Sequence, residues 1–453
     1  MAAQILAICI FVGMFLLIIL DKFERYYITL ASGALVLALV FGVCMHSMSA
    51  IWGTLNLPSI FTSGFWYGAS EEGNSGINWS TIFFIAGMMI MVEGLGKAGF
   101  FRWLCLTLAK LVRYRIVPLL VCFMVLSAVL SMFIDSITVV LFLATVTLEL
   151  AQTMKFNPIP MILSEVFCAN LGGAATMCGD PPNIIVGTSL GYTFFDFISN
   201  TGVAVAICFV LVLIYFVLCF RKRLLRDEKN SGAAVCPQPG TAITNRPAFL
   251  LSAGVFLLAV ILLATHAQTK LTVACIGVIV AALSLVVIGC TSGRKAVLEI
   301  IKGVDYKTLL FFIGLFVSVA GLKETGVLDV IARFITTVSG GNAAIIVVII
   351  LWISAVTSAF VDNIPFAATM IPVVRSIAAA SGIDMGVLAW ALSLGTDLGG
   401  NATPIGASAN VVGTSVAAKG GYPISWGVYC KYCVGATVLV IAVSMGYLFL
   451  RYL

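Results

Sequence analysis

Long apolar runs separated by short polar stretches set the pattern of this chain. A run of about 20 apolar residues is long enough for an α-helix to cross the hydrocarbon core of a bilayer. Ten such runs are predicted to span the membrane, and they lie near 3–20, 28–44, 80–96, 159–189, 201–220, 248–265, 272–290, 308–322, 385–416 and 432–450. Two further apolar runs, 116–152 and 343–377, are each interrupted midway by an aspartate. Each of these two predicts a re-entrant helix–turn–helix hairpin with a polar tip.

Two of the ten runs carry helix-breaking residues near their middle. The run 159–189 contains "CGDPPN", and the run 385–416 contains "GGNATPIG". Glycine and proline in this density interrupt a helix. The freed backbone groups are tolerated at membrane depth only where protein or a water-filled cavity receives them. We therefore expect both runs to be broken helices that present carbonyls, amides and helix ends to a site.

The chain also repeats itself. Shifting the sequence by 227 positions aligns 78–188 with 305–415 without a gap, and 24 of the 111 pairs are identical. Of these, 21 fall in three short blocks: "TIFFIAGMMIMVEGLGKAG" with "TLLFFIGLFVSVAGLKETG", "SAVLSMFIDSI" with "SAVTSAFVDNI", and "NLGGAATMCGDPPN" with "DLGGNATPIGASAN". Such clustering indicates two copies of one structural unit.

An odd number of spans separates equivalent points of the two copies, so the second copy should be upside down relative to the first. Inverted repeats are typical of secondary transporters, whose solute and ion sites lie where discontinuous helices meet near the midplane. The sequence thus predicts an all-α polytopic membrane protein of two inverted repeats, each with five transmembrane helices plus one re-entrant hairpin, and a broken helix in each repeat. The polar segment 227–246 is expected to be a cytoplasmic linker between them.

Composition and charge agree with a multi-pass protein of the cell membrane. Of the 453 residues 61% are hydrophobic and 10% charged, and the mean hydropathy is +1.13. With the N-terminus outside, twenty of the 25 basic residues fall at cytoplasmic ends of spans, as expected for cytoplasmic loops. The five exceptions are Lys270, Lys323, Arg333, Arg375 and Arg451. The net charge of +6 therefore reports topology and gives no reason to expect a nucleic-acid partner.

Four aspartates at predicted hairpin tips or helix breaks are the candidate ion-coupling residues: Asp135, Asp180, Asp362 and Asp397. A charged side chain at membrane depth costs at least roughly 2.5–3.5 kcal/mol, so these positions need a reason. Three of them, Asp135, Asp180 and Asp362, are candidate sodium ligands. The structural alternative, in which each carboxylate caps the end of a broken helix, stays open.

Polar neighbours of the same tips and breaks are the candidate ligands of a transported solute. We expect this role for Ser136, Thr176, Asn183, Asn363, Asn401, Thr403, Ser408 and Asn410. An enzyme is not expected, because no nucleophile–histidine or metal-ligand set appears in the sequence and it has only two histidines. No P-loop is present, so energy should come from an ion gradient or from another subunit. No cofactor is expected apart from a sodium ion.

The motifs "GGAATMCGDPPNIIVG", "NWSTIFFIAGMMIMVEGLGKAGFF" and "GGNATPIGASANVVGTSVAAKGGYPISW" resemble the ion transporter superfamily. The similarity is strongest to the branch of arsenite permeases, NhaD-type sodium/proton antiporters and the melanosomal P protein. It extends over nearly the whole chain. It implies a scaffold that forms a homodimer in the bilayer, and a transport domain that moves like an elevator. By this resemblance the scaffold comprises 1–115 and 247–342, and the transport domain comprises 116–226 and 343–453.

Three activities follow from these expectations. The first is a secondary active transporter that couples a small inorganic solute or anion, arsenite-like or an oxyanion, to a sodium or proton gradient. The second is a sodium/proton antiporter. The third is a sodium-coupled dicarboxylate carrier, whose relatives carry Ser-Asn-Thr tips. Here the tips contain aspartate, and these negative charges disfavour a dianion unless cations or protons neutralise them.

Overall fold

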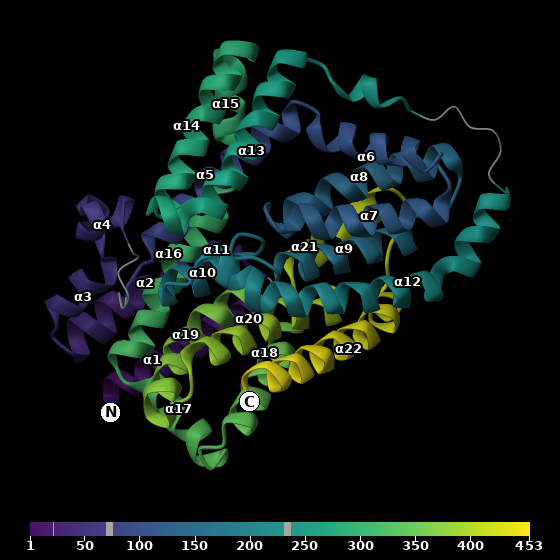
Figure 1. The fold of residues 1–453 in the computed structure, drawn as a ribbon. Helices are drawn as coiled ribbons and strands as arrows, with labels where there is room; N and C mark the ends of the chain where they lie inside the picture. Colours follow the sequence, from purple (N-terminus) through teal and green to yellow (C-terminus); the bar gives the residue numbers. More distant parts are fainter. Residues whose placement is uncertain (21, 69–75, 231–236) are drawn as a thin grey trace.

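Helices form the whole regular framework of the computed structural model, which describes residues 1–20, 22–68, 76–230 and 237–453 (Figure 1). Within these residues the only extended pairing is a single bridge between Tyr67 and Leu271. The predicted all-α class is confirmed. An α-helix pairs its own backbone N–H and C=O groups with each other, which the interior of a bilayer requires.

In its described residues the first half of the chain forms twelve α-helices and three segments of π- or 3₁₀-helix. Their bounds are α1 (Ala2–Leu20), α2 (Arg25–Leu35), η1 (Val36–Cys44), α3 (Met48–Leu55), η2 (Leu57–Phe61), α4 (Ser63–Trp66), α5 (Trp79–Lys97), α6 (Phe100–Leu111), α7 (Ile116–Ser131), α8 (Ser136–Met154), α9 (Ile159–Gly173), α10 (Pro181–Leu190), α11 (Phe194–Phe197), η3 (Ile198–Gly202) and α12 (Val203–Asn230).

The second half repeats most of this order. Its elements are η4 (Pro239–Ala242), α13 (Arg246–Thr269), α14 (Val273–Ser292), α15 (Arg294–Gly303), α16 (Tyr306–Glu324), α17 (Val327–Val338), α18 (Ala343–Ser358), α19 (Asn363–Ser381), α20 (Met385–Gly399), η5 (Gly400–Ala402), α21 (Ser408–Lys419) and α22 (Trp426–Tyr452). The bounds of α5 and α16, of α7 and α18, and of α8 and α19 each differ by the 227 positions of the sequence repeat.

Ten helical segments of the described chain are long and apolar enough to cross a membrane. Eight coincide with predicted spans. The other two are α8 and α19, the second arms of the predicted hairpins, each 19 residues long. The two remaining predicted spans are split into short helices, α9 with α10 and α20 with α21. The predicted hairpins and broken helices are therefore present as helix–turn–helix and helix–break–helix units.

The linker is more structured than the sequence suggests. Helix α12 continues to Asn230, so the first residues of the predicted linker 227–246 are helical. Residues 231–236 lie outside the described chain. Beyond them η4 packs on α6, and the Tyr114 hydroxyl donates to the Pro237 carbonyl at 2.7 Å. Polarity along the linker did not reveal these contacts because they depend on a partner helix far away in sequence.

The helices form two groups, visible in Figure 1 as α1, α2, α5 and α13–α16 on one side and α7–α12 with α18–α22 on the other. In the first group α5 packs on α14, and α2 packs on α16. In the second, each hairpin packs on the broken helix of its own repeat, α7 on α9 and α18 on α20. The first group holds α5 and α16 against α10 and α19. This contact positions the hairpin tips and breaks described next.

Candidate ion and solute site

Both predicted helix breaks are confirmed. Helix α9 ends at Gly173 and α10 begins at Pro181, so seven residues separate the two pieces. In the second repeat α20 ends at Gly399 and α21 begins at Ser408, with the short turn η5 between them. All residues of the first break are buried, as are most of the second, where Ile405 is exposed. Their free backbone groups are therefore received inside the protein, as membrane depth requires.

Matching hydrogen bonds hold the two breaks against the two hairpin tips. The Thr176 hydroxyl donates to the Met132 carbonyl at the tip of the first hairpin. The Thr403 hydroxyl donates in the same way to Ala359, at the tip of the second. Asn183 donates to the carbonyls of Gly173 and Thr176 at 3.1 and 3.0 Å. Asn410 donates to Gly400 and Thr403, both at 2.8 Å.

These four side chains therefore have a structural task that the sequence did not reveal. Both amide hydrogens of Asn183 and of Asn410 are used within the breaks. The Asn183 amide oxygen accepts from Ser393, and that of Asn410 accepts from Asn170 at 2.7 Å. Their contact with a transported solute remains a prediction. Their contact with the break carbonyls is a feature of the fold.

Close backbone approach explains one glycine in each repeat. A Cβ atom on Gly172 would lie 2.1 Å from the Ala128 carbonyl oxygen, and one on Gly399 would lie 2.3 Å from the Cα of Ala355. Real Cβ atoms do not approach other heavy atoms so closely. Each hairpin can thus pack on its broken helix only because a glycine stands at this position near the end of that helix.

Asp180 lies between the tips of the two hairpins. Its Oδ1 accepts a hydrogen bond from the Ser136 hydroxyl at 2.9 Å, and its Oδ2 accepts one from the Asn363 amide at 2.9 Å. Ser136 and Asn363 are the first residues of α8 and α19, and they occupy matching positions in the two repeats. Asp180 precedes α10 without accepting a capping hydrogen bond from it. The capping alternative for Asp180 is therefore wrong, and its carboxylate links the two halves of the chain.

The tip aspartates do cap helices, and they differ in charge environment. Asp135 accepts from the backbone amide and hydroxyl of Thr138 at 2.9 and 2.7 Å. Asp362 accepts from the Ile364 amide at 3.3 Å. It also forms an ion pair with Arg25 at 2.6 Å and accepts from Ser408 at 3.1 Å. Within the described residues the first tip has no such ion pair.

Asp397 is the most isolated of the four aspartates. It is fully buried, and neither carboxylate oxygen accepts a hydrogen bond of normal geometry from the described residues, although the Asn183 amide lies close by. It is close enough to Asp180 for the two carboxylates to interact electrostatically. Its counterpart in the first repeat, Asn170, donates to the side-chain oxygens of Asn401 and Asn410 at 2.9 and 2.7 Å. A buried, unpaired carboxylate charge is costly, so a bound proton or cation would stabilise this side chain.

A cavity of about 470 Å³ opens beside the hairpin tips, and we call it the tip cavity. Its wall contains five carboxylates and two basic residues: Glu24, Glu93, Asp135, Asp305 and Asp362, with Arg25 and Lys307. Both basic groups are paired, Arg25 with Asp362 and Lys307 with Glu24 at 2.7 Å. Asp180 lies just behind this wall, between the lining residues Cys178 and Pro181. Glu93 also lies 3.8 Å from Lys97, so Asp135 and Asp305 are the two wall carboxylates without an ion pair among the described residues. The tip cavity is thus acidic.

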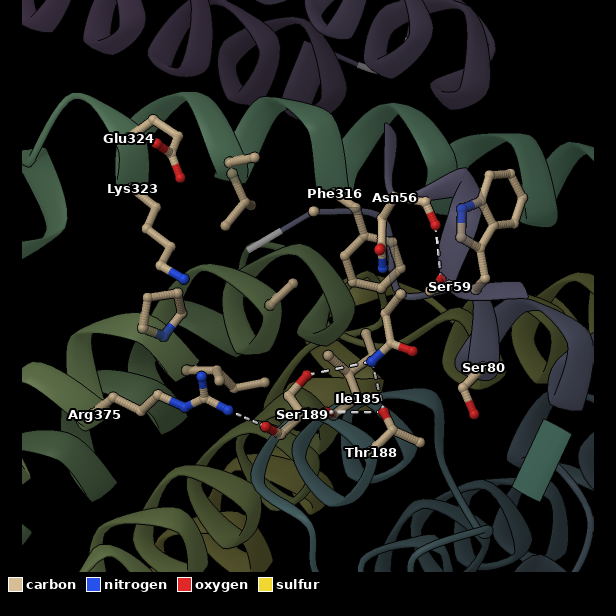
Figure 2. Close-up of a pocket in the computed structure, with 18 of the residues that line it drawn as sticks. Asn56, Ser59, Ser80, Ile185, Thr188, Ser189, Phe316, Lys323, Glu324 and Arg375 are labelled. Atoms are coloured by element: carbon tan, nitrogen blue, oxygen red, sulfur yellow. Dashed lines mark hydrogen bonds between the residues drawn. The ribbon is translucent and has the colours of Figure 1, made fainter. Parts of the chain in front are cut away.

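A second cavity of about 370 Å³ lies at the other ends of the same helices. We call it the Lys323 cavity; its lining includes Lys323 and Arg375 (Figure 2). Each of α5, α16, α10 and α19 contributes early residues to one cavity and late residues to the other. On α10 the neighbours Ile184 and Ile185 line the tip cavity and the Lys323 cavity respectively. The two cavities therefore lie at opposite ends of one helical layer.

The structure brings together most of the residues that the sequence singled out. Asp180, Ser136 and Asn363 meet directly, as do Asp362 and Ser408. Sequence analysis missed the role of Arg25, because nothing local connects it to a carboxylate 337 positions away. It also missed Asn170, although the repeat aligns this residue with Asp397. Among the described residues no three His, Cys, Asp or Glu side chains form a metal cluster. A sodium site would have to use amide and carbonyl oxygens as well.

This architecture is that of a membrane transporter, and comparison with known proteins agrees. The chain belongs to the citrate transporter (CitMHS) family, whose model matches residues 15–395. It is 33% identical over 451 residues to a Mycobacterium tuberculosis protein described as "Uncharacterized transporter Rv2684", which covers 99% of both chains. It is 28% identical to the P protein of Mus musculus over 83% of this chain and 54% of the relative. These findings confirm the resemblance to the ion transporter superfamily.

The fold also resembles that of a solved transporter. The crystal structure of the YdaH transporter of Alcanivorax borkumensis superposes with a TM-score of 0.54 over 81% of this chain and 84% of that one. The two sequences are 16% identical. The likeness is one of fold alone.

Proposed function

We propose that this protein is a secondary active transporter that moves a small inorganic solute or anion, arsenite-like or an oxyanion, with sodium or protons as the coupling ion. The observation that carries the proposal is the position of Asp180. Its carboxylate joins Ser136 of the first hairpin to Asn363 of the second. A cation or proton that binds Asp180 changes the charge at a point where both tips meet. Ion binding and the arrangement of the hairpins are thereby coupled.

The two cavities support a transport path along the contact between the two helix groups. Helices α5 and α16 belong to the first group, and α10 and α19 to the second. Movement of the second group along the first would expose the tips alternately to the two cavities. This is the elevator movement implied by the superfamily resemblance, with the first group as the scaffold. A homodimer built on that scaffold is part of the same proposal.

The charge of the tip cavity bears on the solute. Five carboxylates and two paired basic residues line it, so a bare polyanion would meet repulsion at the distances of a cavity wall. Citrate, which the family description names, or a dicarboxylate would therefore have to enter with neutralising cations or protons. A neutral or weakly charged inorganic solute meets no such barrier.

A sodium/proton antiporter is the second candidate, and the same acidic wall favours it. Asp135 and Asp305, which form no ion pair among the described residues, can attract cations and exchange them for protons. In this alternative Asp180 would bind sodium and protons in turn, and no further solute would be needed.

Transport in proteoliposomes separates the two candidates. The purified protein is reconstituted with an internal pH dye, and sodium is added outside with and without arsenite, phosphate, sulfate or citrate. The proposal predicts that uptake of one of these solutes depends on the sodium or proton gradient. A pH change driven by sodium alone, equal in size with and without every solute, would establish the antiporter instead. No gradient-dependent flux of any kind would contradict both.

A further inference from the structure

Basic residues on the wrong side of the predicted topology are the starting point. Five basic residues do not fall at cytoplasmic ends of spans, and two of them, Lys323 and Arg375, line one cavity. They are 52 positions apart in sequence and come from different helix groups, α16 and α19. Figure 2 shows both side chains extending toward the same part of the cavity. Their convergence is a property of the fold.

The two basic groups differ in how they are satisfied. The Arg375 guanidinium donates to the Ser189 carbonyl near the end of α10. Basic side chains at a helix C-terminus commonly satisfy its last carbonyls, so Arg375 has a structural partner and further donors to spare. Lys323 is half-buried, and no hydrogen bond or ion pair of the described residues involves its ammonium. The three N–H donors of the Lys323 ammonium are therefore free to bind an anion.

Acidic residues at the cavity are present but do not neutralise this pair. Glu324 and Asp329 also line the cavity and attract Lys323 electrostatically. Both are exposed, and Asp329 accepts a hydrogen bond from Ser376 at 2.5 Å. Neither comes within ion-pair distance of Lys323 or Arg375 in the described structure. Solvent screening weakens such exposed carboxylates more than it weakens half-buried cations.

We propose that the Lys323 cavity is an anion-binding site, which takes one small oxyanion or carboxylate between Lys323 and Arg375. A lysine and an arginine together supply the charge-assisted hydrogen bonds that such anions prefer. The volume of about 370 Å³ suits a small ligand. The rest of the wall mixes apolar side chains such as Phe316 and Ile371 with polar ones, among them Asn78, Ser80, Thr188 and Ser189. Asn78 already donates to Thr188 at 2.9 Å, so this edge is ordered.

The site contrasts with the tip cavity, and the contrast gives it a place in transport. The charge pattern predicts that positions 45–79 and 323–342, which contribute to the Lys323 cavity, face away from the cytoplasm. A solute anion that enters from that side would reach this site before it reaches the acidic tips. Because α16 and α19 belong to different helix groups, the bound anion also links the two groups. This role in solute capture deepens the proposed function, whereas anion binding itself can be measured without transport.

Equilibrium binding tests the site directly. Purified protein in detergent is titrated with radiolabelled sulfate, phosphate, arsenate and citrate at low ionic strength, as wild type and as Lys323→Gln, Lys323→Arg and Arg375→Gln. We expect at least one of the four anions to bind the wild type. Loss of one charge-assisted contact should weaken that binding by about ten- to a hundredfold in Lys323→Gln and Arg375→Gln. Lys323→Arg, which keeps the charge, should bind within a few-fold of wild type.

The matched control is Arg333→Gln, which removes the same charge from an exposed position on the neighbouring helix α17. It should bind like wild type. Failure of all four anions to bind the wild type would overturn the proposal, and so would wild-type affinity in Lys323→Gln. Should Arg375→Gln fail to fold because α10 loses its tie, Lys323→Gln alone decides the question. Anion binding that survives in Asp180→Asn separates this site from the coupling role proposed for Asp180.

Discussion

The two helix breaks share a backbone design and differ in charge. In both, a threonine ties the break to the hairpin tip and an asparagine ties it to its own carbonyls. The first break then adds Asp180, where the second has Ala407. The helix that leads into the second break adds Asp397, where the helix that leads into the first has Asn170. Shared contacts build the same shape twice, and the unshared carboxylates make the two shapes chemically different.

This difference indicates which residues serve the fold and which serve the ion. A residue needed for the shape of a break should have a partner 227 positions away, as Thr176, Asn183 and Gly172 do. A residue needed for ion coupling does not require a matching residue in the other repeat. Asp180 lies between the two hairpins and contacts both, so one copy serves both repeats.

Alanine at the two matching glycines should produce the largest effects, and equal ones. In Gly172→Ala and Gly399→Ala the new Cβ would lie 2.1 Å and 2.3 Å from the facing hairpin. Forcing the packed helices apart should cost about 3 kcal/mol in each variant. Thermal unfolding in detergent measures the loss, with Gly254→Ala as control because nothing lies within 4 Å of its Cβ. Unequal losses in the two variants would show that the breaks are not equivalent in packing.

Neutralising the two tip aspartates should lower the stability of the protein by different amounts. We expect Asp135→Asn and Asp362→Asn each to abolish transport while leaving expression and oligomeric state intact. Only Asp362→Asn also leaves Arg25 without its ion pair. This should cost about 1.5 kcal/mol, the lower end for a charged hydrogen bond, because the Arg25 side chain is 35% exposed.

The double variant Arg25→Gln with Asp362→Asn serves as the control for that ion pair. It should recover much of the stability lost in Asp362→Asn, since no charge is left unpaired. Equal melting temperatures for Asp135→Asn and Asp362→Asn would contradict the assigned difference. Wild-type transport in both single variants would leave the two aspartates with capping alone.

Substitution of Asp397 should give the smallest change in melting temperature, and unlike the other substitutions it should not lower it. Its carboxylate accepts no hydrogen bond of normal geometry from the described residues, so Asp397→Asn removes a buried charge and loses only the weak interaction with the nearby Asn183 amide. Without added sodium at neutral pH, we expect a melting temperature equal to or above that of wild type. Asn170→Asp places a new carboxylate against Asn401 and Asn410 oxygens and should lower it. A marked loss of stability in Asp397→Asn would reveal a partner that the structure does not contain.

The sequence predicted a large part of this arrangement because the repeat is visible in it. The offset of 227 positions and the breaker clusters located both hairpins and both breaks within a few residues. Pairings between distant segments were not predictable. Arg25 meets Asp362 across 337 positions, and Asn170 meets Asn401 across 231. Such contacts depend on how the helix groups pack, and no local pattern encodes them. The linker contacts of Tyr114 were missed for the same reason.

Transport by Asp180→Asn, measured against sodium concentration and against pH, tests the central claim most directly. The substitution keeps the shape of the side chain and removes its charge. The account predicts that the dependence of transport on sodium or on pH is lost or strongly weakened, with solute binding less affected. Glu299→Gln, which changes an exposed carboxylate on α15 with a side chain 69% exposed, should keep the wild-type dependence. Unchanged dependence on both sodium and pH in Asp180→Asn would contradict the assignment of Asp180 as the coupling group.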